Sequence, residues 1–215
     1  MIDPEARIHP TALIEDGVSI GGGSSVWDNV HIRRNTLIGR QCIIGEKTYI
    51  AYDVKIGSGV KINSYVYVCA GVVIEDGVMI AAGTIFTNDQ YPRAFEPDDF
   101  SVKTSEPTEE TLTTFVRRGV TIGAGCVIGP GVELGEFSMI GMGSVVTRDV
   151  KPFELVYGQP ARAVGYVCLC GEPLVRGAGK SPSGKKGTAG TSRILSCGKC
   201  RRRYSHSRSG ISAKE

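Results

Sequence analysis

The sequence predicts an all-β protein in which the chain winds as a parallel β-helix. A large apolar side chain, which we call the anchor, stands at every sixth position from Ile8 to Phe86 and again from Val116 to Val146. A small or β-branched side chain usually follows four residues after the anchor, and glycine often follows it directly. A period of six matches neither the 3.6-residue repeat of a helix nor the two-residue repeat of a strand. It is the signature of a parallel β-helix with one short strand and one turn per hexapeptide.

The repeats occupy residues 1–165, which we expect to form the β-helix domain. The anchors should point inward and stack on those of the coils above and below, so each coil is stable only with its neighbours. Glycine after the anchor is expected to relax the backbone at the corners. A sandwich of short strands would need turn signals every 8–12 residues. The strict period of six argues against that alternative.

A single insertion, residues 88–115, interrupts the repeats. The anchors keep their six-residue phase on both sides of it, so the segment is predicted to be a loop that leaves one corner rather than a domain boundary. Ordered loops of this length are usually functional. Within it, Tyr91 and Pro92 stiffen the chain locally, and Arg93 offers a planar bidentate donor to phosphate or carboxylate.

The C-terminal segment, residues 166–215, differs from the rest in composition. It contains 11 basic and 2 acidic residues, whereas residues 1–165 contain 14 basic and 20 acidic ones. Two close pairs of cysteines predict a tetrahedral structural zinc site with no open position for catalysis: Cys168, Cys170, Cys197 and Cys200. Four reduced cysteines without a metal are the alternative. Residues 176–192, rich in Gly, Ser and Lys, are predicted to be a flexible linker between the pairs.

The other features of composition bear on the compartment. The N-terminus lacks the pattern of a secretory signal, and no apolar run is long enough to span a bilayer. Seven cysteines without an export signal indicate thiols or metal ligands rather than disulfides. By phase, Cys42 and Cys126 are predicted to fill space in the core, and Cys69 to have no special role. We therefore expect a cytoplasmic protein with no membrane partner.

Three motifs carry a resemblance to a known family. They are, in order, FTNDQYPRA, then VRRGVTIGAGCVIGPGVELGEFSMIGMGSVVTRDV, then YGQPARAVGYVCLCGEPL. The chain resembles the hexapeptide-repeat nucleotide-sugar N-acetyltransferases of surface-polysaccharide biosynthesis, in particular the UDP-2-acetamido-3-amino-2,3-dideoxyglucuronate N-acetyltransferases. The resemblance implies a left-handed β-helix with three hexapeptides per coil, a homotrimer with active sites between subunits, and some relatives end in a similar cysteine ribbon. Twenty anchors then give between six and seven coils.

The implied activity is acetyl-CoA-dependent N-acetylation of a UDP- or dTDP-linked 3-amino sugar. Such a reaction needs a neutral amine, a stabilised oxyanion and reactants held in near-attack geometry. Asn88 is the first candidate catalytic residue, because relatives place an asparagine of this motif near the sugar amine; alternatively it caps the turn where the loop leaves. Asp89 is a second candidate for orienting the amine. His31 should face outward and could serve as general base, or could be a surface or subunit-contact residue.

Further residues are expected to bind the two substrates. Gly123 and Gly141 would let the pantetheine arm approach the backbone, although glycine there also has structural reasons. In the relatives the segment of Pro160 and Arg162 lies near the coenzyme, so Arg162 would meet a phosphate, with Arg148 as a weaker candidate. Trp27 should point outward and stack on a nucleotide base or a neighbouring subunit. Tyr91 and Arg93 complete the predicted substrate-binding set.

Other functions remain open. A hydroxyl acceptor or another acyl group would make the protein an O-acetyltransferase or a different acyl-CoA transferase. A carbonic anhydrase would need three converging histidines, and the repeats contain one. A non-catalytic trimeric scaffold with a nucleic-acid-binding tail is a further alternative, suggested by the arginines at 201–203. No aromatic platform accompanies these arginines, which argues against nucleic acid.

Overall fold

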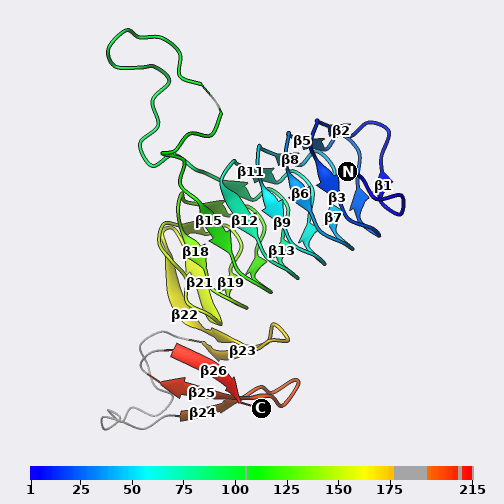
Figure 1. The fold of residues 1–215 in the computed structure, drawn as a ribbon. Coiled ribbons are helices and arrows are strands. Elements are labelled where there is room, and N and C mark those ends of the chain that lie inside the picture. Colours follow the sequence, from blue (N-terminus) through cyan, green and yellow to red (C-terminus); the bar gives the residue numbers. More distant parts are fainter. Residues whose placement is uncertain (105, 177–192, 208–209, 215) are drawn as a thin grey trace.

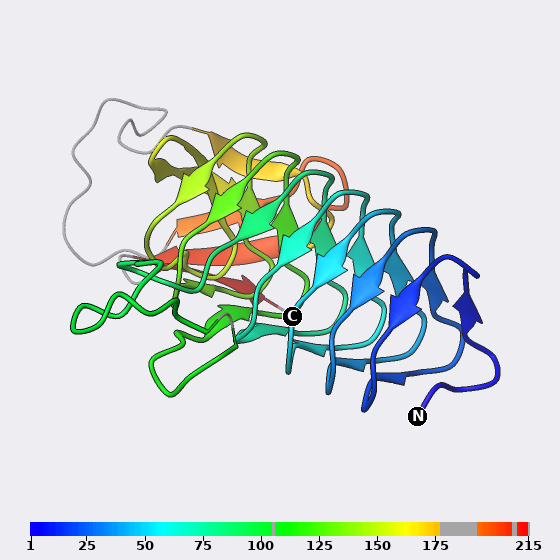
Figure 2. The same ribbon diagram turned by 90° about the horizontal axis from the view of Figure 1, so that it is seen from above.

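The computed structural model describes residues 1–104, 106–176, 193–207 and 210–214. These residues form strands, turns and loops and contain no helix. The chain from β1 to β20 winds as a three-faced parallel solenoid, which confirms the predicted all-β parallel architecture (Figure 1). Successive coils lie one behind another along the stack (Figure 2).

Each face of the solenoid is one sheet of short strands. The first face contains β1 (Arg7–Ile8), β4 (Ser25–Val26), β7 (Ile43–Ile44), β10 (Lys61–Ile62), β13 (Met79–Ile80), β16 (Thr121–Ile122), β19 (Met139–Ile140) and β21 (Glu154–Gly158). The second face contains β2 (Leu13–Ile14), β5 (His31–Ile32), β8 (Tyr49–Ile50), β11 (Tyr67–Val68), β14 (Ile85–Phe86), β17 (Val127–Ile128) and β20 (Val145–Val146). The third face contains β3 (Ser19–Ile20), β6 (Leu37–Ile38), β9 (Lys55–Ile56), β12 (Val72–Ile74), β15 (Thr114–Val116) and β18 (Glu133–Leu134).

The register fixes the length of a coil. Ile8 pairs with Val26 and Ile44 with Ile62, so residues 18 positions apart stack directly. Eighteen residues are three hexapeptides, as the resemblance implies. The strands β1–β20 therefore make between six and seven coils, and β21 adds one more rung to the first face.

The core is the column of anchors. Eighteen of the twenty are buried, and only Ile8 and Ile14, in the first coil, are half-buried because no coil covers that end. The side chains four residues after the anchors are also buried, including the polar Ser24, Thr36 and Thr48. Their hydroxyls donate to carbonyls of the next coil, such as Ser24 Oγ to Gly39 O at 2.9 Å. Buried hydroxyls are thus compensated by hydrogen bonds. Cys42 and Cys126 lie in this column, as predicted.

The corners correct one expectation about glycine. Positive φ occurs three residues after the anchors, for example at Gly143 (φ 68°), and not at the glycines that directly follow an anchor. Those glycines are required by space: a Cβ on Gly39 would lie 2.6 Å from the carbonyl carbon of Gly57 in the next coil. Absence of a side chain, rather than backbone freedom, is what this position needs.

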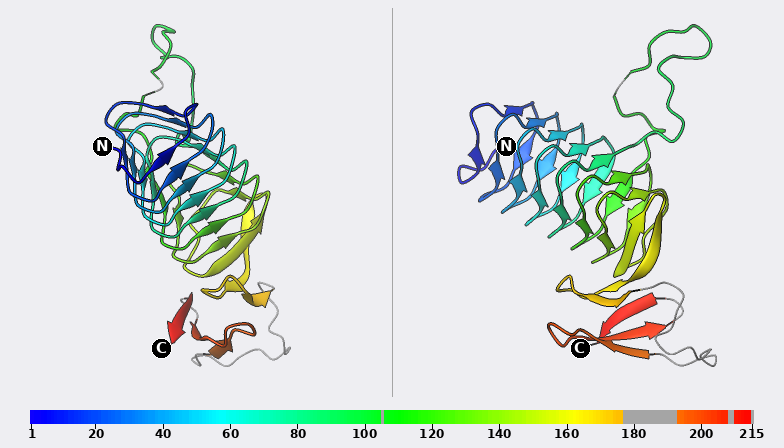
Figure 3. Two further views of the ribbon diagram at one scale, coloured as in Figure 1. Left: turned by 90° about the vertical axis from the view of Figure 1, so that its right-hand side faces the viewer. Right: turned by 180° about the vertical axis from the view of Figure 1, so that it is seen from behind.

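The insertion leaves the corner between the second and third faces, after β14, and returns at β15. Because of it, Ile74 pairs with Val116, 42 residues on, where other coils use 18. The loop projects away from the stack (Figure 3). It contains one isolated bridge, Phe95 to Val102, and a stacked pair of rings, Phe95 and Phe100, 4.5 Å apart.

The chain after β21 turns back on itself. Strands β22 (Ala161–Val167) and β23 (Pro173–Arg176) extend the first face in antiparallel fashion, so this sheet continues past residue 165. A separate sheet follows, made of β24 (Arg193–Ser196), β25 (Arg203–Ser207) and β26 (Gly210–Lys214). Apart from Arg176, the predicted linker 176–192 lies outside the described residues. Among the described residues there is no helix that could cross a bilayer.

A matched pair of substitutions in β7 tests the inward column. Ile44 is fully buried, whereas its neighbour Ile43 is 42% exposed. We expect Ile44→Ala to lower the free energy of unfolding by about 2–5 kcal/mol, because it leaves a cavity between coils. Ile43→Ala should change it by about 0.5 kcal/mol or less. Denaturant unfolding of both variants measures this, and equal losses would contradict the assignment of the two sides of the strand.

Candidate functional site

A cleft of about 890 Å³ lies between the second face and the inserted loop. Its wall on the solenoid side is formed by Arg33, Tyr49, Tyr52 and Tyr67, and residues 88–93 and 103–112 of the loop contribute much of the rest. The three tyrosines derive from one geometric fact. Tyr49 and Tyr67 directly precede anchors on neighbouring rungs, so their rings stack at 5.3 Å with planes 5° apart.

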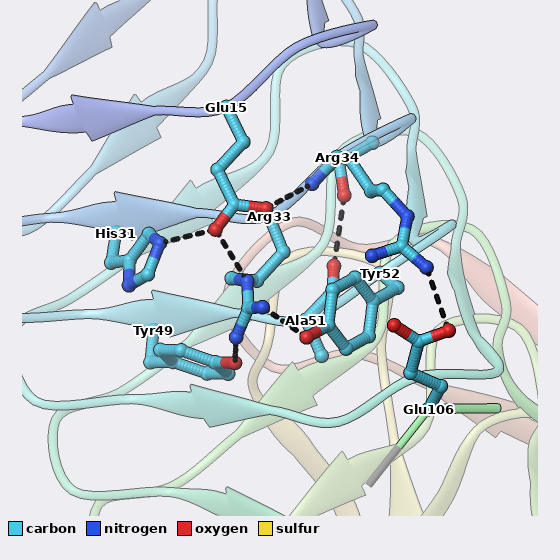
Figure 4. A network of polar contacts seen from close by, with 9 residues as sticks. Glu15, His31, Arg33, Arg34, Tyr49, Ala51, Tyr52 and Glu106 are labelled. Atoms are coloured by element: carbon cyan, nitrogen blue, oxygen red, sulfur yellow. Dashed lines mark hydrogen bonds and ion pairs between the residues drawn. The ribbon is translucent and has the colours of Figure 1, made fainter. Parts of the chain in front are cut away.

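A polar network supports this wall from behind (Figure 4). Glu15 accepts at Oε1 from His31 Nε2 at 2.9 Å and pairs there with Arg33 Nε at 2.6 Å, while Oε2 accepts from the backbone N–H of Arg34 at 3.0 Å. Arg33 then donates from Nη1 to the hydroxyl of Tyr49 at 2.7 Å and from Nη2 to that of Tyr52. One carboxylate therefore orients the arginine that contacts both phenols.

Ionisation of the network follows from these contacts. Partial burial opposes the charge on Glu15, but hydrogen bonds from Arg33, His31 and Arg34 outweigh it and lower the pKa of Glu15 to about 2. The hydrogen bond to Glu15 in turn raises the pKa of Arg33. The pair is ionised at any pH near neutrality.

The loop is attached to the same network. Arg34 Nη2 lies 2.9 Å from Glu106 Oε2, an ion pair between a solenoid corner and the loop. The guanidinium carbon of Arg33 lies 4.1 Å, and that of Arg34 4.5 Å, from the ring centroid of Tyr52. Cation–π contacts of this kind hold the Tyr52 ring in place.

The predicted catalytic residues fall in two places. Asn88 is half-buried and Asp89 exposed, and both line the cleft. They follow Thr87, whose N–H and hydroxyl both donate to Ile128 O, at 3.0 and 3.1 Å. His31 faces outward, as its phase predicts, but its strand lies three rungs from β14. Neighbouring strands are about 4.8 Å apart, so His31 and Asn88 of one chain are separated by about 14 Å.

The predicted substrate-binding residues are also divided. Tyr91 and Arg93 line the cleft, and Tyr91 is 84% exposed. Arg93 Nη1 donates to the carbonyl oxygen of Pro92 at 3.2 Å. Trp27 lies outside the cleft and is 53% exposed, pointing outward as its phase predicts.

The residues expected to bind the coenzyme gather at the other end of the stack. Gly123 and Gly141 follow paired strands of the first face, and a Cβ on Gly141 would lie 2.8 Å from Cβ of Tyr157. Gln159, next to Pro160, donates from Nε2 to Gly143 O at 2.8 Å. Arg148 and Arg162 line one smaller cleft of about 310 Å³, together with Lys151.

The four cysteines of the C-terminal segment form a cluster. Their sulfur atoms all lie within 4.8 Å of one another, with Cys168 Sγ 3.4 Å from Cys200 Sγ and Cys170 Sγ 3.6 Å from Cys197 Sγ. Tetrahedral zinc with Zn–S bonds of about 2.3 Å separates its sulfurs by about 3.8 Å, so the donor set fits a metal. Burial raises the pKa of Cys168 to about 12, whereas the backbone N–H of Arg202 lowers that of Cys200 to about 6.

Several residues of the cleft were not predicted from the sequence: Glu15, Arg33, Tyr49, Tyr52 and Tyr67. A signal for some of them exists. His31, Tyr49 and Tyr67 are spaced by 18 residues and each directly precedes an anchor, so they had to form one outward ladder on the second face. Cys69 also lines the cleft, where burial raises the pKa of its thiol to about 12.

The repeats match a known protein family. Residues 53–88 and 113–148 match the model described as bacterial transferase hexapeptide (six repeats). The chain carries the hexapeptide repeats of bacterial transferases. The expected kinship with hexapeptide-repeat transferases is therefore confirmed for these segments, which flank the inserted loop on both sides.

Individual relatives match over shorter stretches. The dTDP-3-amino-3,6-dideoxy-alpha-D-galactopyranose 3-N-acetyltransferase of Aneurinibacillus thermoaerophilus is 52% identical over 61 residues, 28% of this chain and 32% of the relative. The galactoside O-acetyltransferase of Escherichia coli is 43% identical over 49 residues, 23% of this chain and 24% of the relative. The chain spans about a third of the length of the first of the curated relatives that it matches.

Solved structures with a similar fold include two hexapeptide-type proteins. A hexapeptide-repeat-containing acetyltransferase of Vibrio cholerae complexed with acetyl coenzyme A has a TM-score of 0.48 and 26% identity, covering 60% of this chain and 69% of that one. A mutant of AntD, an N-acyltransferase from Bacillus cereus in complex with dTDP and coenzyme A, has a TM-score of 0.45 and 20% identity, covering 74% and 79%.

The lowered pKa of Glu15 gives a prediction about acid stability. A carboxyl whose pKa falls from about 4.5 to about 2 on folding stabilises the native state above the higher value, and the contribution disappears as pH falls toward the lower one. The difference in unfolding free energy between wild type and Glu15→Gln should therefore be largest at pH 6 and shrink between about pH 4.5 and 2. Denaturant unfolding at several pH values measures it.

Glu136→Gln is the matched control, because Glu136 is exposed and its side chain has no ion pair or hydrogen bond among the described residues. It should differ little from wild type at every pH. A Glu15→Gln difference that is constant across the range would show that the carboxylate charge does not hold the network.

Proposed function

We propose that this protein is an acetyl-CoA-dependent acyltransferase that N-acetylates the 3-amino group of a nucleotide-linked sugar. A segment of 61 residues that is 52% identical to a dTDP-3-amino sugar 3-N-acetyltransferase carries the proposal. The bacterial transferase hexapeptides and the large cleft containing Asn88 and Asp89 support it. The physiological setting that we propose is surface-polysaccharide biosynthesis in the cytoplasm, with UDP or dTDP as the nucleotide.

The chemistry asks little of a base. The amine nitrogen attacks the thioester carbonyl, the tetrahedral intermediate expels the thiolate, and the amine proton leaves to solvent or to that thiolate. Because the thiolate is a good leaving group, orientation supplies much of the acceleration. The carboxamide oxygen of Asn88 would accept a hydrogen bond from the amine and aim its lone pair. Asp89, beside it, would accept from the same amine, and Tyr91 and Arg93 lie within reach of the rest of the substrate.

The acyl donor is assigned to the C-terminal part of the stack. Gly123 and Gly141 leave the backbone uncovered by side chains, and the hydrogen bond from Gln159 to Gly143 holds the Pro160 turn against this backbone. Arg148 and Arg162, in one small cleft, offer cationic donors for coenzyme phosphates.

The second face supports a trimeric assembly of left-handed β-helices. Its outward side chains include Leu13 (56% exposed), Tyr67 (44%) and Ile85 (44%), whereas the first face presents Arg7, Lys61 and Thr121. Apolar side chains in one exposed row favour contact with another copy of the chain. Since Tyr67 also lines the cleft, assembly on this face would put active sites between subunits, where Trp27 and His31 could also act.

For the cysteine cluster we propose one structural zinc ion. Four thiolates leave no open coordination position, so the metal would stabilise rather than catalyse. The cluster packs next to Tyr204, whose hydroxyl lies 3.0 Å from Cys168 Sγ, and Tyr204 meets Phe153 of the last coil at 5.6 Å. Zinc would therefore stabilise the ribbon-like C-terminal segment against the end of the solenoid.

O-acetylation is the second candidate, since the 43%-identical segment belongs to a galactoside O-acetyltransferase. A hydroxyl is less nucleophilic than a neutral amine and makes a stronger demand on a general base. Within one chain, His31 is three rungs from Asn88, which favours the amine acceptor.

Steady-state kinetics with acetyl-CoA tests the function. UDP- and dTDP-linked 3-amino sugars should be acetylated, and their 3-hydroxy counterparts should not. Asn88→Ala should lower kcat by about 10²-fold, because the amine loses its orientation. Asn63→Ala, a half-buried asparagine outside the cleft, is the control and should retain wild-type kcat. Turnover of the hydroxy sugars alone would favour O-acetylation, and an unchanged Asn88→Ala would remove Asn88 from the mechanism.

Metal analysis tests the zinc proposal. The full chain, purified without chelator, should contain about one zinc per chain, and Cys170→Ser should lose most of it. Cys42→Ala, a buried cysteine of the solenoid core, should retain the metal. Chelation should lower the unfolding temperature of wild type but not that of Cys170→Ser. A wild-type protein that binds no zinc would leave the four cysteines as reduced thiols.

A further inference from the structure

Two phenol groups in the cleft each have a hydrogen without a partner. The guanidinium of Arg33 can only donate, so the hydroxyls of Tyr49 and Tyr52 must both act as acceptors toward it. A phenol that accepts still has its own O–H to donate. Among the described residues, neither hydroxyl has a hydrogen-bond acceptor.

Burial makes these unused donors significant. Tyr52 is only 6% exposed, and Tyr49 is half-buried, yet both line the cleft. A buried donor without an acceptor destabilises a protein, and such groups are rare unless a ligand or ordered water completes them. Both hydroxyls contact the two terminal nitrogens of one guanidinium, so they flank the same point of the wall (Figure 4).

The arrangement is rigid because Glu15 holds Arg33. The carboxylate pairs with Nε of Arg33 and leaves its two terminal nitrogens directed at the tyrosines. The same carboxylate is tied to His31 and to the backbone of Arg34, so it cannot swing away without breaking two further hydrogen bonds. Glu15 and Arg33 thus determine the direction in which the phenols can donate.

The cleft has two chemically different sides. The solenoid wall presents O–H donors backed by a cation, whereas Asn88 and Asp89, where the loop begins, present oxygen acceptors. A ligand that fits both sides has anionic oxygens at one end and an amine at the other. A nucleotide-linked amino sugar has this character, through its diphosphate and, if the sugar is a uronate, through its carboxylate.

Resting on the proposed function, we propose that Tyr49 and Tyr52 bind anionic oxygens of the acceptor substrate, and that Glu15 and Arg33 are positioning residues that direct the two hydroxyls into the cleft. The shared chemistry is an anionic oxygen group, from the diphosphate or from a sugar carboxylate. This assigns a recognition role to the solenoid wall as well as to the loop residues Tyr91 and Arg93.

The test compares hydroxyl deletions inside and outside the cleft. Tyr49→Phe and Tyr52→Phe keep the ring and remove the donor. Tyr65→Phe is the matched control, because Tyr65 also accepts from a basic side chain, Lys47 Nζ at 2.9 Å, but lies outside the cleft. Calorimetry with UDP, dTDP and the nucleotide 3-amino sugars, uronate and neutral, measures affinity for the full-length protein without requiring turnover.

Each cleft variant should bind its ligand about tenfold more weakly, the loss of one hydrogen bond to a charged group. A loss already seen with free UDP or dTDP assigns the hydroxyls to the diphosphate; a loss seen only with the uronate sugar assigns them to the carboxylate. Tyr65→Phe should bind as wild type. Glu15→Gln should raise KM for the acceptor several-fold, with kcat and KM for acetyl-CoA little changed, because it acts through Arg33.

Two outcomes would overturn the inference, and they are distinguishable. If the acceptors are bound and acetylated but Tyr49→Phe and Tyr52→Phe bind all of them like wild type, the hydroxyls have no recognition role and the proposed function stands. If no nucleotide or nucleotide sugar binds to wild type and none is acetylated, the proposed function and this inference fail together.

Discussion

The structure depends on the closure of an 18-residue coil around a single column of aliphatic side chains. Two-residue strands such as β8 cannot be stable alone, because each contributes few hydrogen bonds and one inward side chain. Stacking supplies what one coil lacks: hydrogen bonds to both neighbours and a continuous apolar interior. The stacking tolerates no extra atom at the corner, as the 2.6 Å approach at Gly39 demonstrates. The inward side chains, the corner glycines and the register are therefore consequences of one constraint.

The same constraint builds the outer surface. Because residues 18 apart lie on adjacent rungs, any outward position forms a ladder, and the second face has an aromatic one in His31, Tyr49 and Tyr67. Ladders place a carboxylate, an arginine and a phenol on successive coils within hydrogen-bond distance, which gives the network around Glu15. A rigid solenoid thus orients polar groups without needing a large globular core. The inserted loop adds Asn88 and Asp89 to this prepared surface.

The loop and the C-terminal segment are attached to the solenoid by different interactions. An ion pair, Arg34 to Glu106, and exposed polar contacts connect the loop, and exposed pairs of this kind contribute little stability. Stacked rings of Phe137, Phe153 and Tyr204 connect the C-terminal sheet to the last coil, beside the cysteine cluster. The loop can therefore reposition around a substrate, whereas the C-terminal contact is apolar and close-packed.

The sequence by itself determined the solenoid: the period of six predicted the fold, the inward anchors, the outward phase of His31 and Trp27, and the corner from which the loop leaves. It also paired Cys168 and Cys170 with Cys197 and Cys200, because their short spacings leave few other arrangements. Only the tertiary structure decided which outward side chains meet across coils. Glu15, Arg33 and Tyr52 occupy corner positions without a shared spacing of 18, and their contact depends on side-chain direction rather than on period. The three rungs between His31 and Asn88 likewise became visible only when the coils were stacked, since distance along a solenoid is counted in coils and not in residues.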